Sequence, residues 1–189
     1  MDQKQKRVHP LYPKCEEAIA TGILDLKQSE LTLIPQAVFK FMSCAEADVK
    51  ECDISHNELK YLQPQLPLKF NNLTNLNLAH NMMSTLPVEI GSLRGLEVLD
   101  FSYNVFCTLP DIVFQLPHLT LLYAHGNIIR EVDLTKPIET DRLDLVDLRY
   151  NPLTREFCRN LMRININFRV ALYDEGHCDY GFDNETDSD

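Results

Sequence analysis

Residues 73–87 read LTNLNLAHNMMSTLP, and residues 96–110 read LEVLDFSYNVFCTLP. The two stretches place apolar residues at the same spacing, followed by an asparagine (Asn81 and Asn104), and both end on leucine-proline. Sequence similarity at a fixed interval indicates a structural unit that is repeated along the chain. We therefore expect these two stretches to fold alike and to lie side by side.

The asparagine recurs through most of the sequence at intervals of 24, 23, 23 and 24 residues, at Asn57, Asn81, Asn104, Asn127 and Asn151. An earlier unit has Ser29 at this position, and the interval from Ser29 to Asn57 is 28 residues. The longer interval predicts an additional helix or loop, which we place in residues 41–49 on the convex side. Five to six units are predicted in all.

The spacing has a physical explanation. In a short strand alternate side chains share a face, so both leucines of a Leu-x-Leu triplet enter the core. The asparagine amide can satisfy backbone groups where the buried chain turns, which an apolar side chain cannot do. Because no unit buries its apolar side alone, neighbouring units must stack. The sequence predicts an α/β solenoid with a curved parallel sheet on its concave face and irregular or helical convex segments.

Both ends of the array depart from the repeat. A short helix over residues 13–20, ended by Gly22, is expected to cover the first unit, and residues 156–163 also read as helical. Apolar residues then alternate from Ile164 to Leu172, which predicts a closing strand. The predicted organisation is a basic lead and capping helix (1–20), repeats (21–153), a C-terminal cap (154–173) and an acidic, disordered tail (174–189).

By these residues the chain resembles the intracellular leucine-rich repeat proteins with a 23-residue Leu-Pro-x-x-Ile unit. The resemblance covers residues 15–172 and includes the short helix before Gly22, the long first interval and the final LRYNPL. It implies a curved scaffold with no catalytic residues to carry over.

Composition limits the function. The net charge of −10 argues against general nucleic-acid binding, which depends on basic surface. No apolar run is long enough to cross a bilayer, and the first residues lack the apolar segment of a secretory signal. The six scattered cysteines favour reduced thiols. We expect a monomer in the cytoplasm, or also in the nucleus, without a cofactor.

Residues that flank the strand leucines are expected to form rows on the concave face, with one residue from each unit. The row between the leucines, which we name the exit row, is mostly acidic: Asp25, Asp53, Asn77, Asp100, Tyr123 and Asp147. A turn row lies three residues further along each unit, where the chain leaves the strand: Gln28, His56, His80, Tyr103, Gly126 and Tyr150. A middle row lies between them: Lys27, Ser55, Ala79, Ser102, His125 and Arg149.

These rows supply the candidate partner-binding residues Asp53, His56, Asn77, His80, Asp100, Tyr103, Tyr123, His125, Asp147, Arg149 and Tyr150. An acidic surface with aromatic side chains suits a basic or amphipathic segment of a protein. The alternative is that acidic residues of the exit row are ordinary solvated positions of such repeats.

A second candidate surface is the rim, formed by the residue after each asparagine. This position holds Met82, Val105 and Ile128, and contiguous exposed apolar surface often marks an interface. The alternative is that these side chains pack against one another and the neighbouring turn.

Motifs for catalysis are missing from the sequence, which has no phosphate-binding glycine loop and no nucleophile elbow. His56 and His80 near Asp53 and Asp100 could imitate a metal site, but surface histidines on a binding face are commoner. The sequence therefore favours a non-catalytic protein-interaction module, an adaptor or scaffold. Two alternatives remain: a regulatory subunit of a phosphatase or small GTPase, and an acidic nuclear protein that shields basic partners.

Overall fold

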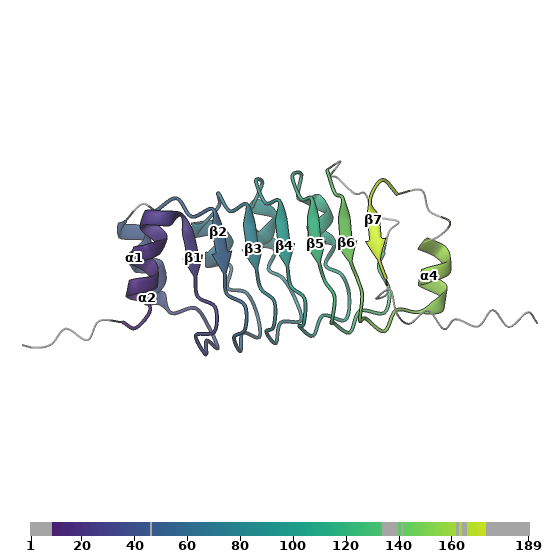
Figure 1. The fold of residues 1–189 in the computed structure, drawn as a ribbon, viewed down its shortest axis with the longest axis horizontal. Helices are drawn as coiled ribbons and strands as arrows, with labels where there is room; N and C mark the ends of the chain where they lie inside the picture. The colour runs from purple at the N-terminus through teal and green to yellow at the C-terminus, as the bar shows by residue number, and fades with distance from the viewer. Residues whose placement is uncertain are drawn as a thin grey trace, which may run out of the picture.

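The computed structural model describes residues 9–45, 47–133, 140, 142–161, 163 and 166–172. Seven three-residue strands form one parallel sheet in chain order (Figure 1). They are β1 (Ile23–Asp25), β2 (Glu51–Asp53), β3 (Asn75–Asn77), β4 (Val98–Asp100), β5 (Leu121–Tyr123), β6 (Leu145–Asp147) and β7 (Arg169–Ala171). The structure confirms the predicted α/β solenoid.

The strands align so that equivalent residues of successive units are neighbours. Leu76 of β3 pairs with Cys52 of β2 and Leu99 of β4, and each of these central side chains is at most 2% exposed. The apolar residue after each of the first six strands also enters the core, as Leu78 does. One continuous core therefore runs along the molecule, as expected for units that bury their apolar sides only by stacking.

The asparagines join each unit to the one before it. The Nδ2 of Asn104 donates to the carbonyl oxygens of Leu78, Phe101 and Ser102, and its Oδ1 accepts from the amide of Met83 at 2.8 Å. Equivalent hydrogen bonds are made by Asn57, Asn81, Asn127 and Asn151. The predicted role of the asparagine in satisfying buried backbone groups is confirmed.

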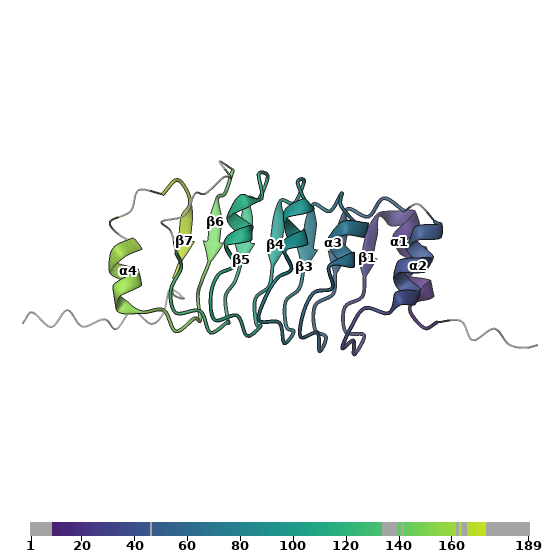
Figure 2. The same cartoon turned by 180° about the vertical axis from the view of Figure 1, so that it is seen from behind.

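Helical segments cover the face opposite the sheet (Figure 2). They are α2 (Gln36–Cys44), α3 (Gln65–Lys69) and the 3-10 helices η1 (Val88–Ser92) and η2 (Asp111–Gln115). The long first interval does contain an extended helix, but α2 begins at Gln36 rather than within residues 41–49. Val38 and Met42 of α2 are fully buried, because residues four apart on a helix share one face.

Helices lie at both ends of the array (Figure 1). The first, α1 (Tyr12–Thr21), ends at Gly22, whose φ of 75° is the left-handed conformation that stops many helices. The second, α4 (Arg155–Leu161), precedes β7, which pairs in parallel with β6. The expected closing strand is therefore present but spans three residues. Ile164 and the predicted tail 174–189 lie outside the described residues.

Within the described part of the chain, no helix is both long enough and apolar enough to cross a bilayer.

Candidate functional site

The exit row lies on the open face of the sheet, and its acidic residues also hold the turns that follow the strands. The Oδ1 of Asp53 accepts a hydrogen bond from the amide of Ser55 at 2.9 Å, and that of Asp100 accepts from Ser102 at 2.8 Å. Asn77 makes the same bond to Ala79 at 3.0 Å. One oxygen is sufficient for this turn, so an asparagine can replace the aspartate there without loss of the bond.

A further row, formed by the first residue of each strand, was not selected from the sequence. This entry row consists of Ile23, Glu51, Asn75, Val98, Leu121, Leu145 and Arg169. Ile23 and Glu51 are exposed, and Val98, Leu121 and Leu145 are partly exposed. The period-two alternation of a strand predicts these positions, because residues two apart share a face.

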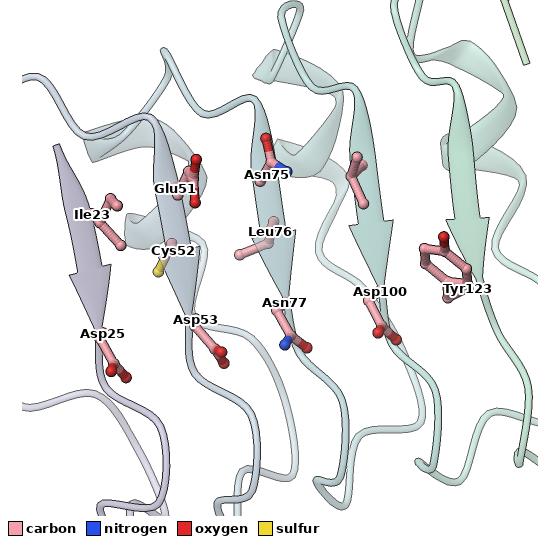
Figure 3. A pocket seen from close by; sticks show the side chains of 11 residues that line it. Ile23, Asp25, Glu51, Cys52, Asp53, Asn75, Leu76, Asn77, Asp100 and Tyr123 are labelled. Atoms are coloured by element: carbon pink, nitrogen blue, oxygen red, sulfur yellow. The ribbon is translucent and has the colours of Figure 1, made fainter.

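The two rows surround a shallow hollow of about 370 Å³ over β1 to β5. Its lining includes Asp25, Asp53 and Asp100 on the exit side and Glu51 and Val98 on the entry side. Figure 3 shows that the exit-row side chains from Asp25 to Asp100 stand in line, one on each strand. The hollow is open to solvent, and it places carboxylates next to apolar side chains.

The turn row has an unusual backbone conformation. His56, His80, Tyr103 and Tyr150 have φ between 51° and 55°, a left-handed conformation that non-glycine residues seldom adopt. Three of these residues form an aromatic stack, with ring centroids 4.2 Å apart for His56 and His80 and 4.3 Å apart for His80 and Tyr103. Burial of the ring and the neighbouring His56 lower the pKa of His80 below its ordinary value of 6.5.

Asp147 departs from the prediction. Its side chain is completely buried, so it is not part of an accessible acidic row. The guanidinium of Arg149 binds both carboxylate oxygens, with Nη2 2.7 Å from Oδ2, and Nδ1 of His125 lies 3.4 Å from Oδ2. Burial opposes ionisation, but the hydrogen bonds and charges of Arg149 and His125 outweigh it and lower the pKa of Asp147.

The middle row also departs from the prediction, because three of its six residues do not face solvent, although Lys27 is exposed. Ser55, Ala79 and Ser102 are at most 6% exposed, whereas His125 and Arg149 are partly exposed. In these units the chain turns inward after the exit-row residue. The next side chain that faces solvent is therefore the one in the turn row.

The remaining candidates are accessible. His56, His80, Tyr103 and Tyr150 are exposed, and Asn77 and Tyr123 are partly exposed. The rim residues Met82, Val105 and Ile128 are 52%, 45% and 51% exposed, which places them at the surface rather than in the core.

The residues that the structure describes do not form a metal site. No three histidine, cysteine, aspartate or glutamate side chains gather there as metal ligands would. His56 and His80 lie parallel, with 12° between their ring planes, and do not converge on a common point. Burial raises the pKa of the Cys52 thiol, which disfavours the reactive thiolate.

Comparisons with known proteins agree with the fold. A family model described as leucine rich repeat matches residues 71–129. A solved leucine-rich repeat protein of Leptospira interrogans superposes with a TM-score of 0.69, at 23% sequence identity, over 87% of this chain and 40% of its own. The stacked parallel strands and the asparagine ladder, together with these matches, show that the chain has a leucine-rich repeat fold.

Among curated proteins, the adenylate cyclase of Schizosaccharomyces pombe is 29% identical over 81% of this chain and 9% of its own length. The alpha subunit of human geranylgeranyl transferase type-2 is 36% identical over 57% of this chain and 18% of its own length. The chain therefore spans less than a fifth of the length of either relative.

Proposed function

We propose that this protein is a non-catalytic adaptor or scaffold that binds a partner protein on the concave face of its sheet. The observation that supports this function is the set of carboxylates around the hollow. Within the described residues, Asp25, Glu51, Asp53 and Asp100 form no ion pair with lysine or arginine. Unpaired surface carboxylates attract a basic segment and favour its correct orientation.

The structural role of the exit row does not remove its capacity to bind. At Asp53 and Asp100 the turn uses one carboxylate oxygen, and the negative charge stays next to the hollow. The aromatic stack borders this row, and exposed aromatic rings commonly anchor protein interfaces. The surface therefore combines charge with aromatic contact area.

Affinity capture with three forms of the full chain tests the proposal. Asp53→Asn/Asp100→Asn removes two charges but keeps the turn bonds, as Asn77 already does at the equivalent position. Glu16→Gln/Glu17→Gln is the matched control, since both side chains are exposed on α1 and neither lines the hollow. Partners should be depleted with the first variant and retained by the control. Equal recovery with all three forms would show that the concave carboxylates are not the binding site.

The proposal includes a monomer that acts in the cytoplasm. Cys15, Cys44, Cys52 and Cys107 form no disulfide in the described part, which suits a reducing compartment. Within the intracellular repeat proteins, the helix before Gly22, the long first interval and residues 148–153 resemble leucine-rich repeat-containing protein 20. We infer kinship from that likeness, and it points to a scaffold rather than to a particular partner.

A further inference from the structure

We infer that the concave face binds an extended peptide segment that carries a basic side chain and, four residues away, an apolar side chain. This inference rests on the proposed function and specifies the chemistry of the partner. It depends on a division of the concave face into an acidic half, over β1 and β2, where three carboxylates gather, and an apolar half, over β4 to β6, where the entry row is apolar and Asp100 is the accessible carboxylate of the exit row.

The acidic half consists of Asp25, Glu51 and Asp53. Asp25 and Glu51 are exposed and Asp53 is partly exposed, so all three carboxylates can be reached from the hollow. The lysine next to Glu51 does not neutralise it, because Nζ of Lys50 is paired with Asp48 at 3.0 Å. A lysine or arginine of a partner would find charge here that the protein itself leaves unpaired in the described residues.

The apolar half consists of Val98, Leu121, Leu145 and Tyr123. The first three occupy the entry row on adjacent strands, where Val98 pairs with Leu121 and Leu121 with Leu145. Their side chains are partly exposed, although the same row holds Glu51 and Asn75 in the earlier units. At this end Asp147 is buried and paired with Arg149, which leaves Asp100 of β4 as the accessible carboxylate beside the apolar row.

The distance between the halves sets the spacing in the partner. Neighbouring strands lie about 4.8 Å apart, so β2 and β5 are separated by roughly 14 Å. An extended chain advances about 3.3 Å per residue, and four residues therefore cover this distance. Side chains four apart in an extended segment share one face, so both can point into the sheet. An α-helix advances about 1.5 Å per residue and would need roughly nine residues instead.

Selection from a random dodecapeptide library displayed on phage, with the full chain as bait, tests this inference. Enriched sequences are then synthesised, labelled with a fluorophore and titrated by anisotropy. The acidic half is tested with Glu51→Gln/Asp53→Asn and the apolar half with Val98→Thr/Leu121→Thr, which keeps strand-compatible side chains. Glu16→Gln/Glu17→Gln again serves as the charge control, and thermal unfolding shows that each variant is folded.

Enriched peptides should carry lysine or arginine four residues from leucine, isoleucine, valine or phenylalanine. Each half-face variant should weaken their binding about tenfold or more, while the control leaves it unchanged. Added salt should weaken peptide binding to the apolar-half variant more than peptide binding to the acidic-half variant, because only charged contacts are screened and the acidic-half variant has lost two of its three carboxylates.

Other results overturn the inference in distinguishable ways. Enriched peptides with only basic or only apolar side chains, or with the two kinds about nine residues apart, would overturn the four-residue spacing. The concave face would still be the proposed binding site. Failure to enrich any peptide would rule out recognition of a linear segment, and affinity capture would still test the proposed function. Peptides insensitive to both half-face variants, together with capture insensitive to Asp53→Asn/Asp100→Asn, would overturn both proposals.

Discussion

The ring of Tyr103 covers Gly126 so closely that a β-carbon on residue 126 would lie 2.6 Å from Cδ1 of the tyrosine. Gly126 occupies the turn row at the place where the stack of His56, His80 and Tyr103 ends. The other turn-row residues carry side chains in a left-handed conformation, so conformation alone does not require glycine here. Glycine is required at this position because the Tyr103 ring approaches so closely.

Gly126→Ala should therefore destabilise the protein and displace Tyr103. Alanine in the left-handed conformation, at a φ of 67°, costs about 1–2 kcal/mol, and the ring must also move away. Urea unfolding measures the free-energy change, and the NMR shift of the His80 ring protons reports its contact with Tyr103. Gly95→Ala is the control, because its β-carbon would lie 3.9 Å from the nearest atom, the oxygen of Leu73. Equal effects of the two changes would contradict the assigned role of Gly126.

Asn104→Ala should destabilise the solenoid far more than Asn77→Ala. Asn104 is 6% exposed and satisfies three carbonyl oxygens and the Met83 amide, and each buried group left unpaired costs about 1–3 kcal/mol. Asn77 is partly exposed, and its bond to the Ala79 amide is worth about 1 kcal/mol. Urea unfolding of both variants compares them directly. Losses of similar size would mean that the asparagine ladder is not a major source of stability.

Ionised Asp147 should contribute stability that disappears in acid. Its pKa in the folded state lies below the ordinary value of 3.8, so the unfolded chain binds the proton more readily. The contribution is therefore complete above that ordinary value and is lost as the pH falls through the folded-state pKa. Asp147→Asn should be less stable than the wild type at neutral pH, and the difference should shrink in acid.

Chemical unfolding at a series of pH values, followed by tyrosine fluorescence, measures this difference. Asp144→Asn is the control: its ion pair with Arg169 has side chains 59% and 74% exposed, and such pairs contribute little. A stability difference for Asp147→Asn that is the same at every pH would show that ionisation of this carboxyl does not stabilise the fold.

The sequence pattern predicted the parallel register and the core, since both follow from apolar spacing around residues such as Leu76 and Asn81. Two features could not be predicted from this pattern, each for its own reason. Asp147 occupies an exit-row position like Asp100, and only the combination of Arg149 with His125 of the preceding unit encloses it. The position of α2 could not be read from the interval length, which gives the number of additional residues but not where the helix begins.

The entry row was missed for a different reason. Val98, Leu121 and Leu145 are apolar and adjoin the core leucines, so they read as additional core residues rather than as surface. Strand geometry places them on the opposite face from Leu99, Leu122 and Val146. The alternation of side chains along each strand therefore predicts this accessible apolar surface, which the number of hydrophobic residues alone does not reveal.

Val105→Lys/Ile128→Lys should leave stability nearly unchanged and reduce partner capture. Both side chains are about half exposed, and the turn is held by their backbone amides, which donate to Met83 and Phe106. Surface changes of this kind alter the unfolding free energy by within about 0.5 kcal/mol. Ile129→Ala, at the fully buried neighbouring position, is the stability reference and should lose about 2–5 kcal/mol.

Thermal unfolding and affinity capture of both variants separate two roles for the rim. A loss for Val105→Lys/Ile128→Lys close to that of Ile129→Ala would mean that these side chains stabilise the fold. Unchanged stability with unchanged capture would leave the rim as ordinary surface. A third outcome is unchanged stability with loss of the same partners that depend on Asp53 and Asp100. The contact surface would then extend from the concave face to the rim, because the stacked rings lie in the turns between these two surfaces.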